Sequence, residues 1–197
     1  MEVATELYNH NGVSNVSSRR IAAELGISHG NLEYHFKTKE ILILAIFKEM
    51  SGAFSEFYPK ENDTPLSLKH FHMLLVSIQG IQKRYSFLMN DLLEVIRKYP
   101  SVNKHVEAGT TLRMKQVRQY FDDFLGQGYL KPEALPGYYL RLQHSIRILI
   151  TFWLPQNEIL ACFKFEHHNE MTSHIWELLF PNLTDEGLAV YKATIQS

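Results

Sequence analysis

The sequence has little of several features that define other classes of protein. Among 197 residues there is one cysteine, Cys162, so neither an internal disulfide nor a cysteine-based zinc site can form. The 20 Lys and Arg residues nearly balance the 21 Asp and Glu residues, which leaves a formal net charge of −1. This balance excludes a polybasic protein that coats nucleic acid, although it is compatible with a small local DNA-binding surface.

Long hydrophobic runs are also absent. The longest cover residues 41–47 and 146–154, far below the roughly 20 apolar residues that a membrane-spanning helix needs. The N-terminus lacks the basic segment followed by an apolar stretch that marks a secretion signal. We therefore expect a cytoplasmic protein with no membrane partner, and the single cysteine agrees with a reducing compartment.

Strand patterns are missing, and helical periodicity takes their place. Apolar residues recur three and four positions apart between glycines and prolines, without the alternation and hairpin turns of a sheet. We expect an all-α protein of about ten helices, near residues 2–9, 18–25, 28–36, 39–58, 65–79, 85–98, 101–125, 137–154, 163–179 and from 184 onward.

Residues 17–39, SSRRIAAELGISHGNLEYHFKTK, predict two very short helices joined by a tight turn. Helices of about two turns are unstable alone, so these two must pack on each other. Gly26 permits the positive φ of the turn, and the Ser28 hydroxyl can cap the second helix. Apolar residues four apart supply the packing, Ile21 with Leu25 and Leu32 with Phe36. This pattern is typical of a helix-turn-helix, whose second helix enters the DNA major groove.

The same stretch resembles the DNA-binding domain of the TetR/AcrR family of bacterial transcription repressors. The residues that carry the resemblance are Ser17-Ser18-Arg19, Ile21-Ala22, Gly26-Ile27-Ser28, Leu32-Glu33-Tyr34-His35-Phe36 and Lys39. The resemblance covers about residues 3–47 and implies two domains. Residues 1–47 would form a three-helix DNA-binding domain, and residues 48–197 a helical bundle for effector binding and dimerisation.

The resemblance also implies roles for individual residues. Those expected to bind DNA are Ser17, Ser18, Arg19, His29, Gly30, Asn31, Tyr34, His35 and Lys39. The two serines would contact phosphate, and Arg19 a phosphate or a base edge. Residues 29–31 would face base edges, while Tyr34, His35 and Lys39 would hold the phosphate backbone.

Two features depart from the family pattern. Glu33 stands where the family usually has a tyrosine that binds phosphate, and the first helix is shorter than usual. A carboxylate repels phosphate unless it pairs with a neighbouring basic side chain, such as Arg19 or Lys37, or accepts from a cytosine amino group. We therefore expect weak or unusual operator binding. An alternative stays open, namely a helical ligand-binding or scaffold protein whose degenerate helix-turn-helix no longer binds DNA.

Nothing in the sequence indicates catalysis. Glycine-rich phosphate loops, nucleophile elbows and His-Glu-x-x-His are absent, so we expect no enzyme activity and no cofactor. A helical metal site could be imagined at Glu166, His167, Glu170 and His174, where residues 167, 170 and 174 share a helix face. Solvated or interface histidines are the better interpretation, so we expect no metal.

The remaining 150 residues should bind a small-molecule effector and a second copy of the chain, because a two-fold symmetric operator requires a homodimer. Polar residues within apolar stripes are candidate effector contacts: Tyr85, Tyr120 and His144. Without a focus of charge, the expected effector is apolar or aromatic. Aromatic residues of the last long helices are candidate dimer contacts: Phe152, Trp153, Phe163, Phe165 and Trp176.

Overall fold

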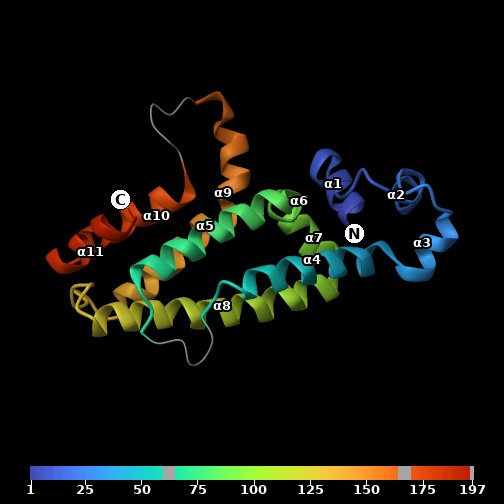
Figure 1. Cartoon of the computed structure of the whole chain (residues 1–197). Coiled ribbons are helices and arrows are strands. Elements are labelled where there is room, and N and C mark those ends of the chain that lie inside the picture. The colour runs from blue at the N-terminus through green and yellow to red at the C-terminus, as the bar shows by residue number, and fades with distance from the viewer. Residues whose placement is uncertain (60–64, 164–169, 196–197) are drawn as a thin grey trace. The chain divides into compact units, whose positions relative to one another are not determined.

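The computed structural model of the chain describes residues 1–59, 65–163 and 170–195. Within these residues the predicted all-α fold is confirmed (Figure 1). There are eleven α-helices and two short 3₁₀ helices, and the described residues contain no strand beyond one isolated bridge between Leu130 and Leu183. None of the described helices is long and apolar enough to cross a membrane.

The helices follow the predicted order closely. They are α1 Glu2–Asn11, α2 Ser18–Glu24, α3 His29–His35, α4 Lys39–Ser55, α5 Leu68–Arg84, α6 Ser86–Asn90, α7 Leu92–Lys98, α8 Pro100–Gly126, α9 Tyr138–Ile159, η1 Leu160–Cys162, α10 Met171–Leu179, η2 Phe180–Asn182 and α11 Asp185–Ile195.

Several predicted boundaries are wrong. The helix expected over 65–79 is Leu68–Arg84 and continues past Gly80, and the described helix near the end of the range 163–179 begins at Met171. Two further differences have local reasons. The helix expected over 85–98 is divided at Asp91, whose backbone (φ −97°, ψ 12°) separates α6 from α7. The helix expected to stop before Pro155 continues to Ile159. Proline removes only its own N–H donor, and the N–H of Leu160 still closes the final turn on the carbonyl of Gln156.

The chain forms two compact units. The first contains residues 1–55 and 81–110, and the second contains residues 56–80 and 111–197. Helices α1 to α4 therefore share a unit with α6, α7 and the beginning of α8. The functional division expected at residue 47 is a different boundary from this one, and it stays a prediction.

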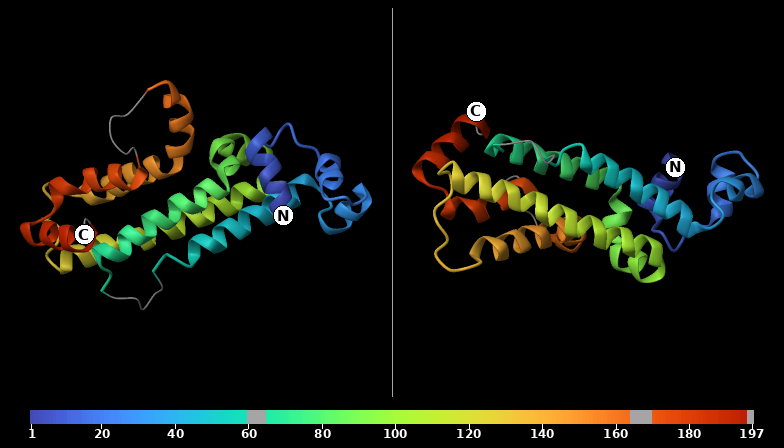
Figure 2. Two further views of the ribbon diagram at one scale, coloured as in Figure 1. Left: turned by 45° about the horizontal axis from the view of Figure 1, so that its top comes forward. Right: turned by 90° about the horizontal axis from the view of Figure 1, so that it is seen from below.

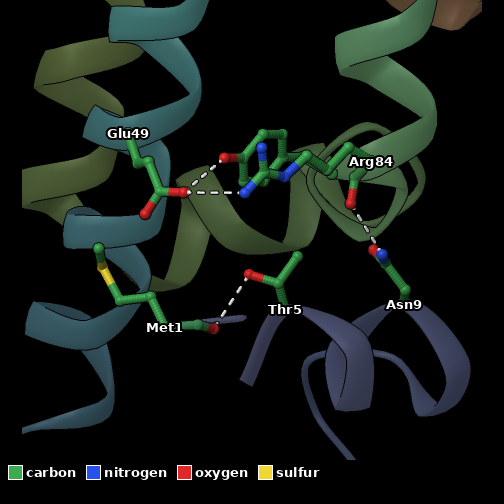
Figure 3. Close-up of polar contacts among 6 residues, drawn as sticks. Met1, Thr5, Asn9, Glu49 and Arg84 are labelled. Atoms are coloured by element: carbon green, nitrogen blue, oxygen red, sulfur yellow. Dashed lines mark hydrogen bonds and ion pairs between the residues drawn. The ribbon is translucent and has the colours of Figure 1, made fainter. Parts of the chain in front are cut away.

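In the first unit, side chains of α1 attach that helix to the start of α6. Tyr8 is fully buried, with its ring centroid 5.1 Å from that of Phe87. The Asn9 amide donates from Nδ2 to the carbonyl of Arg84 at 2.9 Å, and its Oδ1 accepts from the N–H of Phe87 at 3.0 Å. Figure 3 shows the Asn9–Arg84 bond. One side chain thus satisfies two backbone groups where α5 ends and α6 begins.

Two glutamates of α4 accept hydrogen bonds from later residues of the same unit. Glu49 Oε1 accepts from the Tyr85 hydroxyl at 2.8 Å and lies 3.5 Å from Arg84 Nη2 (Figure 3). Burial, together with this bond to Glu49, raises the pKa of Tyr85 to about 12. Glu40 Oε1 accepts from the N–H and the hydroxyl of Ser101 at 3.0 and 2.6 Å, which lowers the pKa of Glu40. Glu40 thereby caps the first turn of α8.

The second unit has an aromatic core. The ring of Phe71 lies 5.3 Å from Tyr120, 5.9 Å from Phe124 and 5.7 Å from Trp176, measured between centroids. Trp176 is buried, and its Nε1 donates to Nδ1 of His72 at 3.2 Å. These contacts join α5, α8 and α10 around one core.

We predict that Asn9→Ala destabilises the protein by about 1–3 kcal/mol, because it leaves the Arg84 carbonyl and the Phe87 N–H without their partner. Asn15→Ala is the matched control, since the bond that its amide makes within the described residues is to the carbonyl of Asn11, one turn earlier. Urea unfolding followed by circular dichroism measures both. Equal stability of the two variants would show that the Asn9 bonds contribute nothing.

Candidate nucleic-acid interface

Helices α2 and α3 form the predicted helix-turn-helix. Each has seven residues and begins at a serine: Ser17 Oγ accepts from the N–H of Arg20, and Ser28 Oγ accepts from the N–H of Asn31, both at 3.2 Å. Gly26 adopts φ +65°, the left-handed conformation expected of the turn. In Figure 2, α2 and α3 lie side by side beside the beginning of α4.

The packing between α2 and α3 differs from the prediction at one residue. Ile21, Ala22 and Leu32 are buried as expected. Leu25 is 42% exposed and does not complete the predicted pair with Ile21. It is the C-terminal cap of α2, where the chain already turns toward Gly26, and the half-buried Ile27 follows it.

One side of α3 is open to solvent. Gly30, Asn31 and His35 are exposed, and the ring of Tyr34 is 82% exposed. A Cβ added at Gly30 would meet no atom within 4 Å. Among the predicted residues of α2, Ser17 and Arg19 are exposed and Ser18 is half-buried. The residues expected to bind DNA from α2 and α3 therefore carry accessible side chains or backbone.

Glu33 is paired within α3. Its Oε1 lies 3.6 Å from Nε2 of His29, one turn earlier, and the two side chains are 53% and 34% exposed. A protonated His29 would offset the Glu33 charge, which is the internal pairing that a carboxylate on a DNA-binding helix requires. The sequence suggested Arg19 or Lys37 as the partner, whereas the structure places His29 there.

Lys39 occupies an unexpected position. Its ammonium donates to the carbonyl of Val16 at 2.7 Å and also to that of Val13. Burial, reinforced by the charge of Lys98, lowers the pKa of Lys39. Lys39 thus ties the segment between α1 and α2 to the start of α4. Since an ammonium has three donors, one donor is left for the predicted phosphate contact.

The predicted effector residues have different surroundings. Tyr85 lies in the first unit and bonds Glu49, whereas Tyr120 lies in the aromatic core of the second. His144 is exposed, and its role as an effector contact stays a prediction. Its neighbours one turn away, Leu140 and Ile148, are 51% and 52% exposed, so this face of α9 points to solvent.

The predicted dimer residues divide into two groups. Phe152 and Phe163 are exposed, as a contact surface requires. Trp153 and Trp176 are 9% and 2% exposed and pack in the core of their own unit, and their role as dimer contacts stays a prediction. Phe165 lies outside the described residues, as do Glu166 and His167 of the imagined metal site.

The outward face of α9 is a surface that the prediction missed. Leu140, His144, Ile148 and Phe152 recur every four residues and are all exposed, and we call them the α9 stripe. A mostly apolar cavity of about 330 Å³ lies at its end, lined in part by Ile148, Phe152, Trp153 and His174. The four-residue period was the available signal, but periodicity alone does not say which face points outward.

Comparisons with known proteins agree in one family. The profile described as "Bacterial regulatory proteins, tetR family" matches residues 1–46, and that described as "Bacterial transcriptional repressor" matches residues 49–191. The HTH-type transcriptional regulator QacR of Staphylococcus aureus is 30% identical over 118 residues, which cover 60% of this chain and 63% of that protein. The Fatty acid metabolism regulator protein of Bacillus subtilis is 23% identical over 166 residues, covering 80% and 83%.

Solved structures support the same fold. A TetR-family transcriptional regulator from Marinobacter aquaeolei superimposes with a TM-score of 0.84 over 98% of this chain and 94% of that chain, at 24% identity. The ketosteroid transcriptional regulator KstR2 of Mycobacterium tuberculosis gives a TM-score of 0.64 over 93% of each chain, at 14% identity.

We predict that Lys39→Met lowers the free energy of unfolding by about 1–3 kcal/mol, because two backbone carbonyls lose a charged donor. Lys48→Met, at an exposed position of α4, is the control and should change stability by less than about 0.5 kcal/mol. Chemical denaturation of both variants measures the difference. If Lys39→Met is as stable as the control, the ammonium does not support the helix-turn-helix.

Proposed function

The chain belongs to the TetR family of bacterial transcription regulators, and from this premise we propose that it is a cytoplasmic repressor that binds a two-fold symmetric DNA operator as a homodimer. Residues 1–47 bind DNA in this proposal. Residues 48–197 bind a second copy and a small-molecule effector. Regulators of this family control transcription and are not enzymes.

The solvent-facing side of α3 is the observation that carries the proposal. It presents Gly30 and Asn31 at the N-terminal end, the part of a recognition helix that meets base edges. An asparagine amide can bond adenine at N6 and N7, and Gly30 lets the backbone come close to the bases. Tyr34, 82% exposed, is a large aromatic side chain with a hydroxyl that can donate to phosphate.

Few charges support this contact. Ser17, Ser18, Arg19, His35 and the third donor of Lys39 are the proposed phosphate contacts. Arg20 is less available, because its Nη2 donates to Asn11 Oδ1 at 3.2 Å. Residues 1–48 contain five Lys and Arg and five Asp and Glu, so this region has no net charge. We expect modest affinity for non-specific DNA and a shallow dependence on salt.

The α9 stripe is the proposed dimer contact. Its apolar side chains, Leu140, Ile148 and Phe152, are exposed on one face with His144 between the first two, and pairing with a second copy would remove them from water. A homodimer places two α3 helices on successive turns of the major groove, about 34–36 Å apart. An effector that stabilises a different α3 separation would release the operator by shifting the population of conformations.

We predict that Glu33→Gln tightens binding to duplex DNA by about two- to fivefold, because it removes a negative charge from the recognition helix. Glu24→Gln, an exposed residue of α2, is the matched control. Arg19→Ala should weaken binding and reduce the slope of log K against log salt by about one. Fluorescence anisotropy over a salt series measures all three. Absence of salt-dependent duplex binding in the unmodified chain would favour the degenerate helix-turn-helix instead.

We predict that Ile148→Glu converts the dimer to monomer, because it would bury an unpaired charge in the contact. Leu135→Glu introduces the same charge at a 62% exposed position before α9 and should leave the dimer intact. Light scattering coupled to size exclusion gives the mass directly. A dimeric Ile148→Glu variant would place the contact elsewhere on the chain.

A further inference from the structure

A carboxylate lies on the exposed side of α3, the helix that is proposed to enter the major groove. The Glu33 side chain is 53% exposed, and its Oε1 lies 3.6 Å from Nε2 of His29, one turn earlier. Within the described residues, neither side chain forms another hydrogen bond or ion pair. The second oxygen of Glu33 and the remaining lone pairs of the first are therefore available to accept hydrogen bonds from DNA.

The helix surface beside this carboxylate is open. Gly30 precedes Glu33 by three residues, so the two lie on the same side of α3. A Cβ added at Gly30 would meet no atom within 4 Å. The residue of α3 that is buried is Leu32, which packs on the inner side of the helix. The edge of a base pair can therefore approach Glu33 without meeting a side chain at position 30.

Glu33 and His29 together present an acceptor beside a donor. The carboxylate only accepts hydrogen bonds, whereas Nε2 of the imidazole donates in the protonated ring and in one of the two neutral tautomers. A phosphate carries negative charge and acceptor oxygens, so the Glu33 carboxylate repels it. A base edge also offers donors, and the cytosine amino group is the usual partner of a glutamate in the major groove. The pair therefore suits a base edge better than the DNA backbone.

A C·G base pair fits this arrangement better than an A·T pair. In both, the amino donor and the carbonyl acceptor hydrogen-bond each other, so they lie about 2.9 Å apart. This spacing is close to the 3.6 Å between Glu33 Oε1 and His29 Nε2. The cytosine amino group has acceptors on one side only. The adenine amino group lies between two acceptors, N7 and the thymine O4, which repel a carboxylate placed over it.

We propose that Glu33 and His29 determine operator specificity by binding one C·G base pair in each half-site. Glu33 accepts from the cytosine amino group, and Nε2 of His29 donates to O6 or N7 of the paired guanine. Because it requires α3 to lie in the major groove, this role rests on the proposed function. It gives the carboxylate a part in sequence recognition and assigns no phosphate contact to it.

The test compares the duplexes that the full chain and its variants select from a random pool. The unmodified chain should enrich an inverted repeat with C·G at one fixed position of each half-site. Glu33→Gln should shift the preference at that position toward adenine, the usual partner of a glutamine amide, and leave the other positions unchanged. Glu24→Gln removes the same charge from an exposed position of α2, so it is the matched control and should select the original sequence.

Duplexes that differ only at this base pair then measure the preference by fluorescence anisotropy. The unmodified chain should bind the C·G duplex about tenfold more tightly than the A·T duplex or the reversed G·C duplex, in which donor and acceptor change places. Glu33→Gln and His29→Ala should each lower this ratio to about threefold or less. The ratio is the quantity compared, because loss of the charge at residue 33 tightens binding to every duplex. Circular dichroism shows that each variant is folded.

The results that overturn this role differ from those that overturn the proposed function. An enriched inverted repeat in which Glu33→Gln changes no position contradicts C·G recognition and leaves the repressor standing. Equal affinity for the C·G duplex and the reversed duplex has the same meaning. Retention of the full ratio by His29→Ala contradicts the joint role of the two residues. Absence of any enrichment by the unmodified chain contradicts the proposed repressor, and C·G recognition fails with it.

Discussion

The DNA-binding surface depends on the support of two helices that are too short to be stable alone. Each of α2 and α3 has seven residues, below the length at which a helix persists in water. Burial of Ile21, Ala22 and Leu32 holds them together. The Lys39 ammonium then ties the segment before α2 to α4 through two carbonyls. Without these contacts, the exposed face of α3 would have no fixed orientation from which to meet a major groove.

The unit that contains the helix-turn-helix also includes residues 81–110, and hydrogen bonds join these later residues to α1 and α4. The N–H of Val13 donates to Asp91 Oδ2 at 2.9 Å, and the Asn9 amide spans the junction of α5 and α6. Glu40, near the beginning of α4, caps α8 at Ser101. The helix-turn-helix therefore cannot shift relative to α6, α7 and the start of α8 without breaking these bonds. A ligand that displaces those segments would also displace α1 and α4.

Signals from residues close together in the sequence predicted the fold and the helix-turn-helix. The differences between prediction and structure concern side chains whose burial is set by residues far away in the sequence. Ser17, Gly26 and Ser28 act within three residues of themselves, so their roles could be predicted. His144 and Trp153 both lie on α9, and periodicity assigned each to a face without saying which face was buried. Arg113 is buried although it is charged, and no pattern among its neighbours in the sequence indicates this. Its burial depends on Tyr58, 55 positions earlier in the chain.

The central claim is that two copies of α3 bind one symmetric duplex, and selection of bound duplexes from a random pool by the full chain tests it most directly. The account predicts enrichment of an inverted repeat whose half-sites are centred about one helical turn, or a multiple of it, apart. A pool that shows no enrichment over its input, or that yields a single asymmetric half-site, would contradict the account.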